Sequence, residues 1–552
     1  MNIVRSHFTI VLSLALGLLA LPAAADTDLT YQGGWRNFDD VVNGWDWSLP
    51  AGVKPAPRSG IFNLNSKVPS DFPGYHLKQV NAKWRDLEPV EGKYDFSSIK
   101  SALNDTSYDG VMLNVRGMVV SIQDSNGNPV LGQEVTAPTW LSNSAPKFTE
   151  PLRNGVRITN MVIYDTRVKT KLLALIKAIG ASGIPGDNRL VAQIIHGVSG
   201  SRGEECCASQ NNATAVNETM HDVIAAWTTA YGPNSKKLAW LKEDPATLFD
   251  AAVVGGGTGA RGGIIENWIR SQYTPGNSKQ TGQIYENGYL TVDENFAPIA
   301  QGRTWMDEYE AFDRKFTSPE RLQQNYRMAT LRALQMRRST VWTETNSVIN
   351  PKLLNWASLE LGQSTGTAAD AWVALISTWT RSQGGDIEVK NFERWLYQRD
   401  TSGYDTKPAI KQDHSFNASG NDLLASSKWY VNLARTGNAI GIAIDDRFLS
   451  DGPNEVAIKV TYFDADKNPW TLEYSKPDGS IGSRRVQGEA SGVVRTATFF
   501  LNDLMATRKG TDFDFRLKSD SGTTPFMFVR LVRLNGSSVP TTPRPPDSLS
   551  VE

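Results

Sequence analysis

The chain has 552 residues, of which 40% are hydrophobic and 21% are charged, and its 57 lysines and arginines nearly balance its 58 aspartates and glutamates. This composition is typical of a globular protein, and it excludes a disordered chain, a collagen and a coiled coil. The net charge of −1 provides no electrostatic footprint for a nucleic acid. The length exceeds that of one compact domain of ordinary size, so a large domain with an accessory domain is expected.

Residues 1–25 have the features of a secretory signal peptide. Arg5 supplies a positive charge, an apolar stretch continues to Leu21, and Ala23-Ala24-Ala25 is a small-residue cleavage site. The apolar stretch is about a dozen residues long, which is shorter than the roughly 20 residues that a membrane-spanning helix needs. We therefore expect export, a mature chain that begins at Asp26, a secreted or periplasmic location and no membrane span.

The two cysteines, Cys206 and Cys207, are adjacent in the sequence. An oxidising compartment favours disulfides, and a bond within this chain can only be a vicinal one. Two free thiols are the alternative. The sequence has five histidines and neither an HExxH nor a CxxC motif, so no metal site is predicted.

Strand-like apolar runs alternate with helical patterns from about residue 58 to residue 345. Eight such runs with helices between several of them predict an α/β fold, a (β/α)8 barrel. The runs are Ser59–Asn65, Lys78–Trp84, Val111–Arg116, Leu190–His196, Lys237–Leu241, Ala251–Gly255, Arg303–Glu308 and Ser339–Glu344. Helices are expected over Thr166–Ile179, with Gly180 as the stop, and from Ser318-Pro319 to Arg338.

Beyond about residue 410 the apolar runs become short and alternating, with turn residues between them, which predicts an antiparallel β-sandwich. The runs are Ala439–Ile444, Val456–Phe463, Trp470–Tyr474, Thr496–Leu501, Phe513–Leu517 and Phe526–Leu534. We therefore expect a barrel with an N-terminal extension over residues 26–405, a sandwich over residues 406–535 and a flexible, proline-containing tail over residues 536–552.

Two segments resemble clan A glycoside hydrolases, especially their β-galactosidase-like members. The W-x-x-L-E-P-x-x-G-x-Y-D-F pattern from Trp84 to Phe96 is similar to the second strand and following turn of that family. Ala137–Leu141 is similar to the Pro-x-Trp-Leu sequence after the third strand. The resemblance implies a barrel with a C-terminal sandwich, hydrolysis of O-glycosyl bonds in a poly- or oligosaccharide, and no cofactor. Within the first motif, Glu88-Pro89 is expected to end a strand and order a turn.

In this family the acid/base glutamate follows the fourth strand, which makes Glu204 the candidate here. The chain has Gly203-Glu204 where the family usually has an Asn-Glu pair. A glycosidic leaving group needs a carboxylic acid that stays protonated near neutral pH, and a partly desolvated glutamate can supply it. His196, at the expected strand end, is either a substrate-binding residue or a buried structural histidine.

The family places its nucleophile at the end of the seventh strand. Counting Arg303–Glu308 as that strand nominates Glu308, whereas counting Val341–Glu344 nominates Glu344. An ion pair with a nearby arginine is the alternative role for either glutamate. Retention requires the two catalytic carboxyl groups to lie about 5–5.5 Å apart.

Several tryptophans are candidates for stacking on sugar rings, with core packing as the alternative role. Trp84 and Trp140 are expected to line the cleft, and Trp305 lies near a candidate carboxylate that its ring would desolvate. Trp35, Trp45 and Trp47, in the N-terminal extension, would lengthen the same cleft.

Two short motifs suggest other chemistry. Gly257–Gly262 matches the GxGxxG dinucleotide fingerprint, but it also fits a glycine-rich loop at the sixth strand that offers Arg261 to a substrate hydroxyl or carboxylate. Gly362–Gly366 matches GxSxG, but a nucleophile elbow follows a strand, whereas a helical pattern precedes this segment.

The expected function is therefore exported glycoside hydrolysis by two carboxylates. A catalytically silent carbohydrate-binding protein and an exported polysaccharide lyase are the alternatives. In each case the expected partner is a poly- or oligosaccharide.

Overall fold

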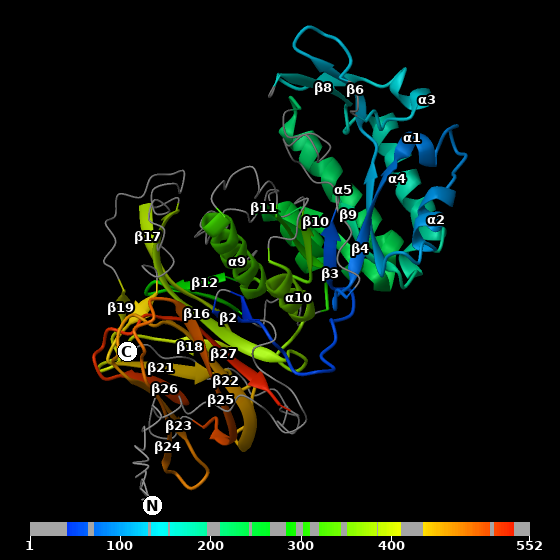
Figure 1. The fold of residues 1–552 in the computed structure, drawn as a ribbon. Helices are drawn as coiled ribbons and strands as arrows, with labels where there is room; N and C mark the ends of the chain where they lie inside the picture. The colour runs from blue at the N-terminus through cyan, green and yellow to red at the C-terminus, as the bar shows by residue number, and fades with distance from the viewer. Residues whose placement is uncertain are drawn as a thin grey trace, which may run out of the picture.

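The computed structural model describes residues 41–42, 44–63, 71–130, 134–152, 155–195, 210–241, 246–264, 283–293, 302–309, 319–343, 350–382, 385–409, 434–507 and 513–534. Figure 1 shows a barrel surrounded by helices and, beside it, a stack of β-sheets. No helix in these ranges is long and apolar enough to cross a bilayer.

Eight parallel strands form a closed barrel in the order in which they occur along the chain, and the last strand pairs with the first. The strands are β3 (Gly60–Asn63), β4 (His76–Lys83), β5 (Gly110–Arg116), β9 (Leu190–Ile195), β10 (Leu238–Leu241), β11 (Gly259–Ile264), β14 (Trp305–Tyr309) and β15 (Thr340–Thr343). The predicted (β/α)8 barrel is confirmed. Because β14 is the seventh strand and β15 the eighth, the count that made Val341–Glu344 the seventh strand is wrong.

The sixth strand differs from the prediction. Ala251–Gly255 belongs to a π-helical turn (Asp250–Gly255) after α6 (Ala246–Phe249), and β11 is formed by the glycine-rich segment itself. A side chain at position 259 would place its Cβ 1.6 Å from the carbonyl oxygen of Thr304, so glycine is needed where β11 approaches that backbone. The GxGxxG motif therefore leads into a barrel strand and does not form the strand–turn–helix of a dinucleotide site.

The helices around the barrel begin at recognisable caps. The Asp165 carboxylate accepts hydrogen bonds from the backbone N–H groups of Arg167 and Val168, and Asn212 caps the next long helix in a similar way. The helices are α1 (Trp84–Leu87), α2 (Ser97–Leu103), α3 (Thr139–Ser142), α4 (Thr166–Ala181), α5 (Ala213–Tyr231), α9 (Pro319–Gln335) and α10 (Pro351–Glu360), with 3-10 turns at Ile184–Gly186 and Gly232–Lys237.

Gly180 does not end its helix as predicted. Helix α4 continues to Ala181, and a Cβ on Gly180 would lie 2.8 Å from the Cβ of Ala230 on α5. The glycine therefore permits close packing of α4 against α5. The turn after the helix uses Gly183 instead, whose φ of 84° is in the left-handed region.

The second part of the molecule is the predicted β-sandwich. One sheet has the order β12-β13-β17-β16-β27-β20-β19, with β22 and β25 joined to it through β27, and the other has the order β18-β21-β26-β23-β24. The strands are β12 (Gln283–Glu286), β13 (Tyr289–Val292), β16 (Asp370–Ser382), β17 (Gly385–Arg394), β18 (Leu396–Gln398), β19 (Lys407–Pro408), β20 (Arg435–Thr436), β21 (Ala439–Ile444), β22 (Pro453–Phe463), β23 (Trp470–Ser475), β24 (Ile481–Val486), β25 (Val494–Met505), β26 (Phe515–Ser519) and β27 (Phe526–Arg533).

The sandwich begins earlier in the chain than the predicted boundary at residue 405. Strands β16, β17 and β18 supply residues 370–398 to its two sheets, so the barrel part ends with α10 and the short segment after it. The hairpin β12–β13, from the connection between barrel strands β11 and β14, also pairs with β17 at the edge of the sandwich. The barrel and the sandwich are therefore connected to each other by more than one segment of the chain.

Two small sheets complete the fold. Strands β6 (Val119–Asp124), β7 (Lys147–Thr149) and β8 (Val156–Met161) form an antiparallel sheet in the connection that follows β5. The hairpin of β1 (Val41–Val42) and β2 (Trp45–Asp46) lies in the N-terminal extension.

An aromatic cluster joins the barrel to the sandwich. Trp47 packs against Trp356 of α10 with ring centroids 5.0 Å apart, and both rings contact Phe528 of β27. Trp45 stacks on Trp47 at 5.9 Å, and both are at most 4% exposed. The expectation that Trp45 and Trp47 line an extended substrate cleft is therefore wrong, because their rings are buried in this interface.

Charged groups are buried beside these rings. The Asp370 carboxylate accepts hydrogen bonds from the Trp356 indole at 2.9 Å and from Arg530 Nε at 2.7 Å. Arg530 also donates to the backbone oxygens of Asp46 and Ser48, at 2.8 and 3.2 Å. The hydrogen bonds of this Asp370–Arg530 ion pair therefore connect α10, the sandwich and the N-terminal extension.

Two further ion pairs extend this network. Lys459 Nζ lies 2.6 Å from Asp46 Oδ2, and Arg394 Nη1 lies 3.0 Å from Glu360 Oε2. All four side chains are at most 2% exposed. Removing one partner of the Lys459–Asp46 pair leaves an uncompensated buried charge, which costs about 3–5 kcal/mol. The network therefore favours one arrangement of barrel and sandwich.

We predict that Glu360 makes stability depend on pH. Burial and the neighbouring Asp370 raise the pKa of the Glu360 carboxyl well above its ordinary value of 4.5. The folded chain then holds a proton that the unfolded chain has lost, so the free energy of unfolding should fall as pH rises from about 4.5 through the raised pKa. Glu360→Gln cannot titrate and should lose this dependence.

Denaturant unfolding between pH 4.5 and pH 9 measures the effect. The matched control is Glu218→Gln, at an exposed position of α5, which should follow the wild-type profile. Identical pH profiles for wild type and Glu360→Gln would contradict the prediction.

Candidate active site

Apolar side chains fill the barrel interior near the amino-terminal ends of the strands. They form one buried cluster that includes Phe62, Leu77, Met112, Ala192, Ile194, Ala239 and Met306. Because side chains on alternate positions of a strand point to the same face, these residues identify the inner face of six of the eight barrel strands. The described interior is therefore packed near the amino-terminal ends of the strands, and the carboxyl ends are where a ligand site is expected.

The same inner faces become polar toward those carboxyl ends. On β4 the positions after Leu77 are Gln79, Asn81 and Lys83, and on β5 the positions after Met112 are Asn114 and Arg116. The Asn81 amide oxygen accepts hydrogen bonds from Asn114 Nδ2 at 3.0 Å and from Gln79 Nε2 at 3.2 Å. Lys83 Nζ pairs with Glu134 Oε1 at 3.1 Å. Sequence reasoning missed these residues, although the alternation along both strands could have identified them.

Buried polar atoms without a hydrogen-bond partner on the described inner faces include the Gln79 amide oxygen, the Trp342 indole nitrogen and the Thr340 hydroxyl. Trp342 is half-buried and packs against the apolar interior cluster. Buried polar groups normally have a protein or water partner, so these atoms are available to a bound ligand or to water.

Position 308 lies on this inner face, near the carboxyl end of the seventh strand. It is two residues beyond Met306 of the interior cluster, and it pairs in register with Trp342 of β15. Position 307 shares the opposite face with Trp305, whose ring packs among the surrounding helices. The strand register thus places position 308 on the inner face of the barrel and position 307 on its outer face.

The other predicted site residues are described less fully. Arg261 is in β11, in register with Leu241 and Met306, and it follows the outward-facing Ala260. Position 261 therefore belongs to the inner face of the barrel. His196, Glu204, Cys206, Cys207 and Glu344 lie outside the described residues.

Two of the expected sugar-stacking tryptophans are core residues. Trp84 is 0% exposed and Trp305 is 1% exposed, and both belong to the core between the barrel and its helices. Trp305 packs edge-on against Phe249 at 6.3 Å. A ring with no accessible face cannot stack on a sugar, so the prediction that these rings line the cleft is wrong. Trp140 is half-buried, and its proposed contact with sugar stays a prediction.

Glu88 orders a turn, as the sequence predicted, but it does not end a strand, because β4 ends at Lys83 and Glu88 caps the short helix α1. Its carboxylate accepts hydrogen bonds from the Trp84 indole and from the backbone N–H of Gly92, both at 2.7 Å. The Trp140 indole donates to the Glu88 backbone oxygen at 2.8 Å. Glu88 therefore holds the turn after β4 and positions both tryptophans.

We predict that Glu88→Gln destabilises the fold while leaving turnover per folded molecule unchanged. An amide offers one acceptor oxygen to two donors, and leaving a buried donor unsatisfied costs about 1–3 kcal/mol. Thermal unfolding measures the lower Tm. Glu91→Gln is the control, because its carboxylate pairs with Lys171 at the surface and its loss should change Tm little. An unchanged Tm for Glu88→Gln would contradict this role.

The GxSxG motif does not form a nucleophile elbow. Gly362–Gly366 follows helix α10, and the Ser364 hydroxyl interacts with Thr367 Oγ1 at 3.1 Å. Helix α10 itself begins with an Asn350 cap and Pro351. This confirms the expected loop after a helix.

No family model matches the sequence, and no curated protein matches it. Several solved structures that match the fold are glycoside hydrolases. An exo-β-1,4-mannosidase from Opitutaceae bacterium strain TAV5 is 11% identical with a TM-score of 0.33, over 57% of this chain and 62% of that enzyme, so the chain spans less than two thirds of its length. A glucosidase from Croceicoccus marinus is 7% identical with a TM-score of 0.32, over 88% and 97% of the two chains.

A pyruvate kinase from Cryptosporidium parvum also matches, with 9% identity and a TM-score of 0.26 over 57% of this chain and 72% of that enzyme. Unrelated enzymes often share the barrel architecture. Similarities this distant bear on neither the substrate nor the roles of individual residues.

Proposed function

We propose that this protein is a glycoside hydrolase in which Glu308 is the nucleophile and Glu204 the general acid/base. The observation that carries the proposal is the position of residue 308. It is on the inner face of the seventh strand, near the carboxyl end, whereas the interior near the amino-terminal ends is filled by apolar side chains. Catalytic residues of such barrels come from the carboxyl ends of their strands. The resemblance of Trp84–Phe96 and Ala137–Leu141 to clan A enzymes supports the proposal, because that family places its two catalytic glutamates after the fourth and seventh strands.

The proposed reaction has two steps and retains the anomeric configuration. The Glu308 carboxylate attacks the anomeric carbon while the Glu204 carboxyl protonates the departing glycosidic oxygen, so one C–O bond forms and another breaks. The Glu204 carboxylate then takes a proton from a water molecule, which attacks the anomeric carbon and releases Glu308. No cofactor enters either step.

The substrate in this proposal is a poly- or oligosaccharide outside the cytoplasm. The amide groups of Gln79, Asn81 and Asn114, on the inner faces of β4 and β5, offer donors and acceptors to sugar hydroxyls. Export through the segment 1–25 is part of the proposal, and N-terminal sequencing of the exported protein should give Asp26 as the first residue.

Glu308→Gln should lower kcat by about 10³-fold or more, because an amide is a poor nucleophile. Asp307→Asn is the matched control, since it makes the same chemical change on the opposite face of the strand and should retain activity. Glu344→Gln should also retain activity, because position 344 follows the eighth strand. Reducing ends released from a panel of neutral and acidic polysaccharides measure the rates. Full activity in Glu308→Gln would overturn the assignment.

The loss of activity in Glu204→Gln should depend strongly on the leaving group of the substrate. Hydrolysis of natural glycosides should fall by about 10²–10⁴-fold, the usual contribution of a general acid. Bond cleavage in dinitrophenyl glycosides should be affected far less, because their leaving group needs no protonation. An equal loss on both substrates would contradict the acid/base role. Products that absorb as unsaturated uronates would instead identify a lyase.

A further inference from the structure

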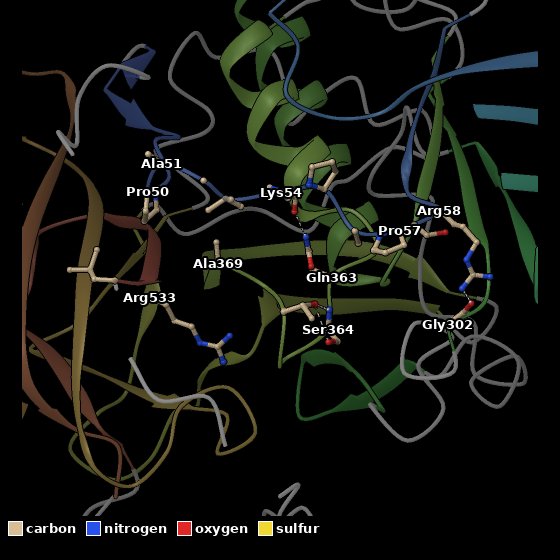
Figure 2. Close-up of a pocket in the computed structure, with 18 of the residues that line it drawn as sticks. Pro50, Ala51, Lys54, Pro57, Arg58, Gly302, Gln363, Ser364, Ala369 and Arg533 are labelled. Atoms are coloured by element: carbon tan, nitrogen blue, oxygen red, sulfur yellow. Dashed lines mark hydrogen bonds between the residues drawn. The ribbon is translucent and has the colours of Figure 1, made fainter. Parts of the chain in front are cut away.

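A second cleft lies at the opposite end of the barrel from the candidate active site. It has a volume of about 830 Å³ and opens where the amino-terminal ends of the barrel strands meet the sandwich (Figure 2). Its walls are the segment Pro50–Arg58 before β3, the turn Gly302–Arg303 before β14, the loop after α10 and the end of β27. None of these residues has a role in the proposed catalysis.

The charge on the wall of this cleft is positive. Lys54, Arg58, Arg303 and Arg533 line it, and no aspartate or glutamate is among its lining residues in the described part of the chain. Glu360 raises the pKa of Arg533 electrostatically, but this carboxyl group also contacts Arg394. The positive charge of the cleft is therefore largely uncompensated.

The arginines are held in place by neutral partners. Arg533 donates to the backbone oxygens of Ala368 at 3.0 Å and Thr365 at 2.7 Å. Arg303 donates to the Thr258 oxygen at 3.2 Å, and Arg58 donates to the Gly302 oxygen. Backbone carbonyls orient a guanidinium group without neutralising it. The geometry is therefore preorganised for an anion that would supply the missing charge.

Two further observations indicate that these cations are poorly compensated. Arg58 Nη1 and Arg533 Nε are buried and have no hydrogen-bond partner. Burial lowers the pKa of Arg533 to about 10 and also lowers the pKa of Arg58 and of Arg303. Partial desolvation thus destabilises each charge, and a bound anion would reverse that effect.

The cations are separated along the cleft. Figure 2 shows Arg533 on the sandwich side and Arg58 on the barrel side, with Gln363 and Ser364 between them. Figure 2 also places Lys54 in this middle section. The exposed Thr367 contributes a hydroxyl group to the same cleft wall. This arrangement suits an extended molecule that carries several acidic groups and many hydroxyls.

We propose that this cleft binds an acidic oligosaccharide as a second, non-catalytic site. Its carboxylate or sulfate groups would contact the arginines and Lys54, and its hydroxyls would contact Ser364 and Thr367. The choice of a saccharide rests on the proposed function, whereas the requirement for an anion rests on the cleft alone.

The test uses the full-length protein and isothermal titration calorimetry with tetragalacturonate, with cellotetraose as the neutral probe of the same length. Lys54→Glu and Ala51→Glu each place a carboxylate at an exposed position of the cleft wall. Each should weaken tetragalacturonate binding about tenfold, which corresponds to roughly 1.4 kcal/mol. Raising NaCl from 50 to 200 mM should weaken the wild-type binding as well.

The matched control is Lys467→Glu, which makes the same charge change at an exposed position. Val456 of β22 pairs with Arg533, and Lys467 lies beyond the other end of that strand. This variant should bind like the wild type, and cellotetraose should not compete for the cleft.

Three results would overturn the proposal. They are no binding of tetragalacturonate, binding that Lys54→Glu and Ala51→Glu leave unchanged, and binding of inorganic sulfate or phosphate without binding of the saccharide. The last result would reject the saccharide as the ligand class. Equilibrium binding needs no turnover, so the activity of Glu308→Gln tests the proposed function separately.

Discussion

The buried charges between barrel and sandwich are the constraint on which the rest of the structure depends. Asp370, the first residue of β16, accepts hydrogen bonds from Trp356 of helix α10 and from Arg530 of β27. Each charge was removed from water, so the network is stable only when every partner is present. The aromatic rings around it supply the apolar burial that the ion pairs do not. Together they fix how the two parts of the chain meet, and this also creates the cationic cleft.

The two ends of the barrel interior differ in composition. Near the amino-terminal ends of the strands the inner faces are apolar and closely packed, while near the carboxyl ends they carry amides and charged groups. A parallel barrel exposes the carboxyl ends of all eight strands at one face, so residues distant in sequence meet there. Position 308 belongs to that face by the register of β14, which is the physical basis of the catalytic proposal.

Particular residues show where sequence patterns sufficed and where they did not. Ala439–Ile444 was predicted as a strand with the bounds that β21 has, because its alternation with flanking turns is a local signal. Ala251–Gly255 has the same apolar character but forms a π-helical turn, and the glycine-rich segment after it became the strand. The reason is the approach of β11 to the Thr304 carbonyl, a contact between segments far apart in the chain that leaves no local signature. The tryptophans mislead similarly, because an indole suits both a sugar and a core.

The sequence by itself determined the class of fold. Its alternating strands and helices specified the barrel, its short alternating runs specified the sandwich, and the Glu88 motif specified the turn that this residue holds. These features follow from periodicity and local hydrogen bonding, which act within a few residues. The tertiary structure decided which strand is seventh, which tryptophans are buried, and where the barrel ends and the sandwich begins. Those outcomes depend on long-range strand pairing and on the buried charges at the joint, whose free energy appears only when distant segments come together.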